Sequence, residues 1–363
     1  MATNLLPALD PAPIPGPVWL FHLLWVVTFL VHMLFVNVVL GGSVLATLAG
    51  DKRRGLQKFF VEANSWAISF AITFGIAPLL FIQVLYGRLF YTATILVAGS
   101  WLGMLGLLTV GYYLNYVAKF RLQKDKPAGI ALPLSALCFV LIAAIQVMVN
   151  LLHLQPDRWE GVWTQAKSAL ADPTFLPRFL HFLLAALAMA GALIAYVAVR
   201  QAQKGKQEPQ QAENARVGVR AALITSVFQL VVGFWLLLAL PSPVLSAFMK
   251  GGAATTLPLG FGILAGVGLL VVLASIRDPL AEATKVRRAM EFLVGAVVLM
   301  VVTRHQLREV YLASWKPLEG AEVAPQWGIF LLFLVTFLVG VALTVYALVK
   351  AATDRPGPGE QAA

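Results

Sequence analysis

Long runs of apolar residues follow one another along the chain and are separated by short polar segments. Windows of about 20 apolar residues, enough to span a hydrocarbon layer roughly 30 Å thick, fall at 18–48, 60–86, 93–118, 130–153, 176–200, 218–240, 257–275, 287–312 and 327–350. This pattern predicts nine transmembrane helices. A short polar turn around "GRLFYTAT", residues 87–94, is expected to separate the second helix from the third.

Composition places the chain in the same class. Of 363 residues, 60% are hydrophobic and only 12% are charged, which indicates a multi-pass membrane protein. The single cysteine, Cys138, excludes internal disulfides, CxxC metal sites and the CxxCH attachment of covalent haem. The net charge of +10 could suggest nucleic acid, but the basic residues are distributed as membrane topology would place them.

Basic residues alternate between the two sides of the predicted helices. The segments "DKRRGLQK", "KFRLQKDK", Arg200 to Arg220, "IRDPLAEATKVRR" and the C-terminal tail hold 19 of the 27 lysines and arginines. By the positive-inside rule, the N-terminus is outside and the C-terminus is inside. The first eighteen residues contain no lysine or arginine, so they lack the basic region of a cleaved signal peptide.

The predicted fold is an all-α integral membrane protein with two four-helix bundles and a peripheral ninth helix, in the cytoplasmic (inner) membrane of a bacterium. Its parts are an extracytoplasmic segment 1–17, a first bundle 18–153, an extracytoplasmic loop 154–175, a second bundle 176–312, an outer loop with the ninth helix 313–350, and a cytoplasmic tail 351–363. The low-complexity stretch "KGKQEPQQAENAR" is expected to be a solvated cytoplasmic linker.

Histidines are the first candidates for chemistry. All five, His22, His32, His153, His181 and His305, are expected in the outer half of the membrane or at its outer surface. Buried ionisable groups in membranes usually mark a ligand or an ion path, and neutral imidazole binds haem iron without a compensating charge. A histidine at a helix end, such as His153, could equally bond to a neighbouring helix or lie at the wet interface.

Arginines accompany the histidines on the predicted outer side: Arg88, Arg178, Arg304 and Arg308. They could flank lipid headgroups, or they could pair with haem propionates. All 17 Asp and Glu residues are expected in loops or at helix ends. A proton-coupled transporter would ordinarily need an intramembrane carboxylate, so this class is disfavoured.

Four segments together resemble a known family. "HMLFVNVVLGG", which begins at His32, resembles the first helix of subunit I of cytochrome bd quinol oxidase, and "DPTFLPRFLHFLLAALAMAGALIAY" resembles its fifth. "FAITFGIAPLLFIQ" and "FGILAGVGLLVVLA" resemble the second and seventh helices. The resemblance covers most of the chain in order. It implies that His32 takes the place of a ligand to a haem of the oxygen-reducing pair, and His181 that of a ligand to the low-spin haem b.

The chain also departs from this family, and the resemblance is to a divergent member. Leu264 stands where the family has a methionine ligand, and "GSWLGMLGLLTVGYYLNY" lacks the glutamates of the third helix. In "VVTRHQLREVY", Val302 takes the place of a glutamate and His305 that of the arginine in a Gly-Arg-Gln-Pro-Trp motif. The loop that the family uses for quinol has shrunk to "PSPVLSAFMKGGAATT".

Because histidines appear as acid and methionine ligands disappear, we expect six-coordinate bis-histidine haems, which relay electrons but do not readily bind oxygen. His22 and His32 lie about 80° apart around a helix, so they cannot clamp one iron together. We expect His32 and His181 to bind different haems, with His305 and either His153 or His22 as their partners.

The expected function is that of a b-type cytochrome that moves electrons between membrane quinol and an acceptor at the outer face. Two or more non-covalent haem b groups are the expected cofactors, and quinol is the expected substrate. The expected partners are lipid and a c-type cytochrome or other subunits of a respiratory complex, without nucleic acid. Two alternatives remain: a terminal oxidase that reduces oxygen with altered ligands, and a haem-free membrane anchor.

Overall fold

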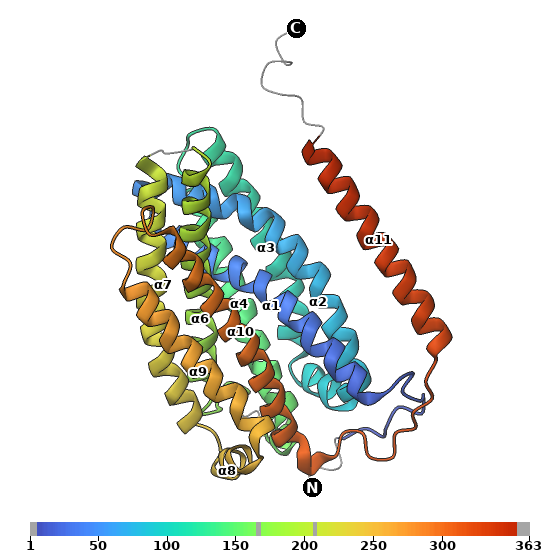
Figure 1. Ribbon diagram of the computed structural model, residues 1–363. Coiled ribbons are helices and arrows are strands. Elements are labelled where there is room, and N and C mark those ends of the chain that lie inside the picture. Colours follow the sequence, from blue (N-terminus) through green and yellow to red (C-terminus); the bar gives the residue numbers. More distant parts are fainter. Residues whose placement is uncertain (1–5, 165–167, 206–208, 354–363) are drawn as a thin grey trace.

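The chain folds into long helices that run alongside one another (Figure 1). The computed structural model describes residues 6–164, 168–205 and 209–353. In these ranges, the helices of 22 residues or more are α1 (Val18–Ala49), α2 (Arg54–Leu96), α3 (Ala98–Gln123), α4 (Ala131–Leu154), α6 (Phe175–Gln203), α7 (Pro209–Leu238), α9 (Ala253–Ala274), α10 (Ala283–Leu312) and α11 (Trp327–Thr353). Two shorter helices, α5 (Trp159–Thr164) and α8 (Ser242–Lys250), lie between them.

Helices are the form that this composition requires in lipid, because a backbone without water must satisfy its polar groups internally. Six helices, α1, α2, α4, α6, α7 and α9, are long and apolar enough to cross a membrane by length and composition. Hydroxyl groups bond back to their own helix, as the Thr28 hydroxyl does to the Leu24 carbonyl at 2.7 Å. The fold is that of a multi-pass membrane protein. Membrane crossing by α3, α10 and α11, which would complete nine spans, stays a prediction.

The predicted turn at 87–94 is wrong. This segment continues α2 beyond a kink at Tyr86, whose φ and ψ are −141° and 22°. Leu89 and Phe90 are buried there, and the segment lacks proline, so burial of its apolar side chains favours a continued helix. The chain turns instead at Val97, before α3 begins.

Two predicted loops contain helix. The stretch 204–216, expected to be a solvated linker, is helical from Pro209 onward, and Ala215 is fully buried against the core. The outer loop 154–175 contains α5. Both segments are helical because apolar contacts stabilise helical turns whose composition is otherwise polar. Residues 206–208 of the stretch and 165–167 of the loop lie outside the described residues, as do 1–5 of the N-terminal segment and 354–363 of the tail.

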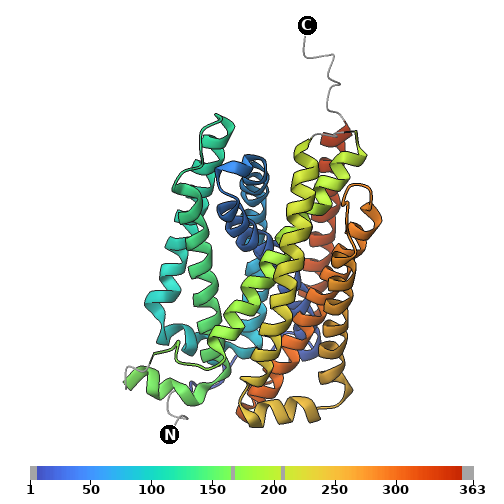
Figure 2. The same ribbon diagram turned by 90° about the vertical axis from the view of Figure 1, so that its left-hand side faces the viewer.

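Close packing between α1 and α6 joins the N-terminal and C-terminal halves. At Gly41 the helices approach so closely that a methyl group there would lie 1.9 Å from the Ala186 carbonyl oxygen. Small residues at such contacts let the two backbones approach closely, and the resulting van der Waals attraction drives helix association in lipid. Figure 2 shows α3 and α4 at one side of the molecule and α9 at the other. The division of these helices into two four-helix bundles is still a prediction.

Helix α11 leans away from the other helices (Figure 1). Its preceding loop pairs with the N-terminal segment, because the Ile14 amide donates to Glu322 O at 2.8 Å and the Ala324 amide donates to Ile14 O at 2.9 Å. Ile14 is buried at this pairing. The described side chains of α11 are largely exposed and apolar, a surface that suits lipid contact.

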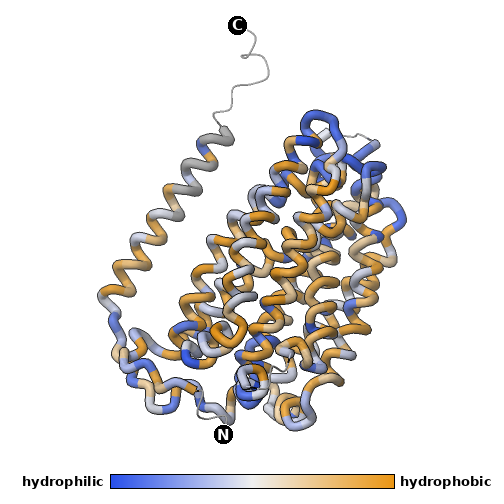
Figure 3. The backbone as a smooth tube through the Cα atoms, turned by 180° about the vertical axis from the view of Figure 1, so that it is seen from behind, coloured by the Kyte–Doolittle hydropathy of each residue, from blue (hydrophilic) through white to orange (hydrophobic). Residues whose placement is uncertain are grey.

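Charged residues gather at one end of the helices, which we call the basic end: residues 50–58, 119–128, 200–205, 209–220 and 275–288 (Figure 3). Ion pairs join three of these segments, with Arg53 3.3 Å from Glu213 and Lys58 2.9 Å from Asp125. Four of the basic segments found in the sequence therefore lie on one side of the bundle. That this side faces the cytoplasm stays a prediction of the positive-inside rule.

We predict that Gly41→Ala destabilises the protein by about 1–3 kcal/mol, because a methyl group at the α1–α6 contact forces the backbones apart. Thermal unfolding of the purified protein in detergent measures the loss. Gly103→Ala on α3 is the matched control, since a methyl group there meets no neighbour within 4 Å. Equal unfolding temperatures for both variants and the wild type would contradict the prediction.

Candidate functional site

The structure divides the histidines into two sets. His32 on α1 and His181 on α6 each pack against a glycine of a neighbouring helix. His22 and His153 both lie edge-on to the ring of Tyr86, and His305 lies beside His22. We call the second set, together with Trp25, Tyr86, Arg308 and Glu309, the histidine cluster.

His32 is held in one tautomer by α2. Its Nδ1 atom lies 2.8 Å from the carbonyl oxygen of Ala71, and since a carbonyl only accepts, Nδ1 carries the proton. A neutral imidazole in this state leaves Nε2 unprotonated and available to a metal, and ligating histidines usually donate their other ring N–H to a carbonyl or carboxylate in this way. A Cβ at Gly75 would come within 2.9 Å of the His32 ring, so the glycine makes room for this ring position.

His181 projects from α6 toward α7. A Cβ at Gly233 would lie 3.1 Å from its Cε1 atom, and its Nδ1 atom is buried beside the backbone of Gln229. The ring therefore lies between two helices, with Arg178 nearby on its own helix. Leu264, which the resemblance places at a ligand position, is 64% exposed on α9, so this position faces away from the bundle.

His153 is fully enclosed at the end of α4. Its ring is 1% exposed and lies edge-on to Tyr86 and Phe90, with centroids 5.6 and 6.0 Å away. Neither ring nitrogen has a hydrogen-bond partner among the described residues. A buried polar group without a partner costs about 1–3 kcal/mol, so this imidazole is arranged for a ligand or a water molecule.

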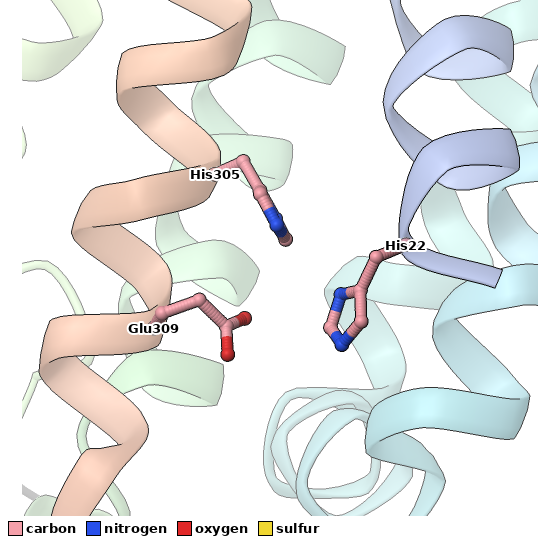
Figure 4. A group of neighbouring side chains, drawn as sticks. All are labelled: His22, His305 and Glu309. Carbon is pink, nitrogen blue, oxygen red and sulfur yellow. The ribbon is translucent and has the colours of Figure 1, made fainter. Parts of the chain in front are cut away.

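His22 and His305 face each other across α1 and α10, and Glu309 joins them (Figure 4). The two imidazole centroids are 5.1 Å apart, and one ligand atom from each of the three residues lies within 4.8 Å of the others. The Tyr86 hydroxyl donates a hydrogen bond to Glu309, and the Trp25 ring lies 5.4 Å from His305.

Of the four predicted arginines, Arg308 is buried, and Arg178 and Arg304 are partly exposed residues with buried guanidinium nitrogen atoms. Arg308 is 2% exposed, and its guanidinium lies 4.0 Å from the Trp25 ring centroid. Its Nε and Nη1 atoms have no partner among the described residues. Arg304 donates to Asn150 Oδ1 at 2.7 Å, and Arg178 lies beside Tyr311. Arg88 is partly exposed: its Nη2 atom donates to the Lys316 carbonyl at 3.1 Å, while its Nε atom is buried without a partner among the described residues.

Asp172 fixes the start of α6, the helix that carries His181. Its carboxylate accepts from the Thr174 amide at 2.7 Å, from Gln155 at 2.7 Å and from Arg158 at 2.9 Å. Burial opposes ionisation of this carboxylate, but these hydrogen bonds outweigh it and hold the pKa of Asp172 below its ordinary value.

The structure also contributes residues that the sequence did not single out. Tyr86, Trp25 and Glu309 complete the histidine cluster. Glu309 follows His305 by four residues on one helix, so the spacing alone placed both on one face. Tyr86 carried no such signal, because its place in the cluster depends on the kink of α2. Iron binding by any of the five histidines stays a prediction.

The helices and the polar groups buried among them define a multi-pass helical membrane protein. No model of a protein family matches the chain, and no curated protein matches it. Among solved structures, bd oxidase from Geobacillus thermodenitrificans is similar, with a TM-score of 0.74, 14% sequence identity, and coverage of 95% of this chain and 100% of that chain. The chain has a bd-oxidase-like fold, so the resemblance seen in the sequence is confirmed for the fold.

We predict that Asp172→Asn lowers the free energy of unfolding by about 1–3 kcal/mol at neutral pH, through loss of hydrogen bonds to a charged group. Because the folded pKa is lowered, the stabilisation is full above the unfolded pKa of about 4 and is lost as the pH falls through the folded pKa. The difference in free energy of unfolding between the wild type and Asp172→Asn, measured in detergent, should shrink between pH 7 and pH 3. Asp157→Asn, an exposed neighbour, serves as control; a difference independent of pH would refute the assignment.

Proposed function

We propose that this protein is a b-type cytochrome of the bacterial cytoplasmic membrane that transfers electrons between membrane quinol and an acceptor at the outer face. A c-type cytochrome or a partner subunit of a respiratory complex would be this acceptor. The observation that supports the proposal most directly is His153, an enclosed imidazole whose two nitrogen atoms are unpartnered among the described residues. It lies near Arg308, which is likewise buried with unpartnered donors.

The residues present fit a haem. His32 offers Nε2 because its Nδ1 proton is engaged by Ala71, and His181 is held between α6 and α7 against Gly233. Such rings can serve as axial ligands, and a bound haem would supply one-electron redox chemistry. His153 is our candidate for a second axial ligand. We infer two or more haems bound without covalent attachment.

Buried arginines would hold the acidic edge of a haem. Arg178, Arg304 and Arg308 present guanidinium nitrogen atoms that are buried without a partner among the described residues. A propionate is a planar carboxylate, and arginine binds such groups with two parallel hydrogen bonds. Burial of an unpaired cation is costly, so an anionic partner accounts for these positions. Arg88, whose Nη2 atom already donates to the Lys316 carbonyl, keeps only its buried Nε atom unpartnered and is the fourth candidate.

Quinol is the proposed donor because the haems would lie toward the outer side of the membrane. The described helices offer no unpaired carboxylate among their buried side chains, so a transmembrane proton path is not part of the proposal. Protons from quinol would leave at the outer face.

A second candidate function follows from the fold. The chain is similar to a bd oxidase over nearly its whole length, so a terminal oxidase that reduces oxygen is the alternative. The resemblance places Val302 and Leu264 at ligand positions, and neither side chain binds iron. We therefore favour electron relay over oxygen reduction. A shift of the reduced spectrum with carbon monoxide, together with oxygen consumption on a quinol donor, would support the oxidase instead.

We predict that His32→Ala and His181→Ala each remove about one haem per chain, because each deletes an axial ligand. The pyridine haemochrome assay counts the haem, and reduced-minus-oxidised spectra show which band is lost. Tyr113→Ala, a large side chain 72% exposed on α3, is the control and should keep all haem. Wild-type protein without haem b would refute the cytochrome and favour a haem-free anchor.

Gly233→Val should displace the His181 ring and weaken the same haem band that His181→Ala abolishes. The added side chain would occupy the space 3.1 Å from the ring, and overpacking forces neighbouring groups to move. Gly260→Val on α9 is the matched control, since its Cβ meets no neighbour within 4 Å. Unchanged spectra for Gly233→Val would show that this contact does not position the ring.

A further inference from the structure

The geometry points to a non-haem metal site at the histidine cluster, in which His22, His305 and Glu309 bind one divalent first-row transition-metal ion. Two imidazoles and one carboxylate form a donor set typical of zinc and iron(II) sites. Among the residues that the structure describes, this is the single group of three or more histidine, cysteine or acidic side chains with such spacing. The inference takes His22 and His305 out of the set of candidate haem ligands and leaves His32, His181 and His153 for haem.

The donor atoms are close enough for a small ion. They lie within 4.8 Å of one another, and metal–ligand bonds of about 2.0–2.2 Å place donors roughly 3–3.5 Å apart. Side-chain rotation can cover that difference. The three side chains point toward a common space between α1 and α10 (Figure 4).

A haem fits this place less well than a small ion. Two axial imidazoles on opposite sides of one iron, with bonds of about 2.0 Å, would have centroids roughly 6 Å apart. The centroids of His22 and His305 are 5.1 Å apart and their planes are inclined by 54°. Glu309 also shares the space between them, where a porphyrin ring would have to lie.

Neighbouring residues hydrogen-bond to a proposed ligand here, as they do in known metal sites. The Tyr86 hydroxyl donates to Glu309, which orients the carboxylate, and second partners of this kind hold metal ligands in place. The buried Nδ1 atoms of His22 and His305 have no partner among the described residues. Two side chains that face one another, each with a buried nitrogen atom that lacks a hydrogen-bond partner, favour one ligand bound by both.

The charges and position are also suitable. Glu309 supplies one negative charge, and Arg308 directs its cation toward the Trp25 and Tyr86 rings, with centroids at 4.0 and 5.4 Å. His22 lies four residues after α1 begins, and Glu309 lies three residues before α10 ends. An ion could therefore reach the site from the aqueous side without crossing the apolar core. Three protein ligands would leave at least one coordination position open.

Zinc chloride titration of the chelator-treated full-length protein tests the site. Competition with a fluorescent zinc indicator should show one tight equivalent per chain in the wild type. His22→Ala, His305→Ala and Glu309→Gln should each weaken it at least tenfold. Glu309→Gln is nearly isosteric and can still accept from Tyr86, so it tests binding without the loss of packing that an alanine variant brings. Glu319→Gln is the control, because Glu319 is an exposed carboxylate paired with Lys316.

Counting haem in the same samples separates this inference from the cytochrome. Loss of zinc with unchanged haem in the three variants confirms the non-haem site, even if the wild type binds no haem at all. Loss of haem in parallel with zinc would overturn it and return His22 and His305 to the haem ligands. Wild-type protein that binds zinc no more tightly than Glu309→Gln would overturn it as well.

Discussion

Polar groups in an apolar surrounding must find their partners within the chain, and the rest of this structure depends on that constraint. Backbone groups meet it through helices, and hydroxyl groups meet it by bonding to the preceding turn, as Thr28 does. The imidazole of His153 and the guanidinium of Arg308 are left unpartnered among the described residues. Neighbouring side chains share this state, among them His22, His305 and Arg304, so together they mark where a further group belongs.

The same constraint explains why helix contacts carry so much of the fold. Lipid is as apolar as the side chains, so burial alone gives little reason for helices to associate. Gly41 instead allows α1 to approach α6 at backbone distance, and Gly191 does the same between α6 and α7. The contact at Gly191 also fixes the spacing of α6 and α7, at which His181 meets Gly233. Packing and chemistry are thus set by the same small residues.

Two chemistries can coexist in this arrangement because the histidines occupy different surroundings. His32 and His181 are each held by one neighbouring helix and a glycine, which suits a planar group between helices. His22 and His305 face each other with Glu309 between α1 and α10, which suits a compact ion. Arg308 lies near the ion site and His153, so its charge would influence both.

Apolar periodicity by itself determined the class of protein, the approximate bounds of the long helices and the gathering of histidines toward one end, because each depends on local composition. The bd-oxidase-like fold was also readable from short motifs in order. Only the tertiary structure decided that α2 continues past Tyr86, that Leu264 faces outward, and that Glu309 joins His22. These outcomes depend on contacts between helices far apart in the sequence, and no local pattern encodes the rotation of one helix against another.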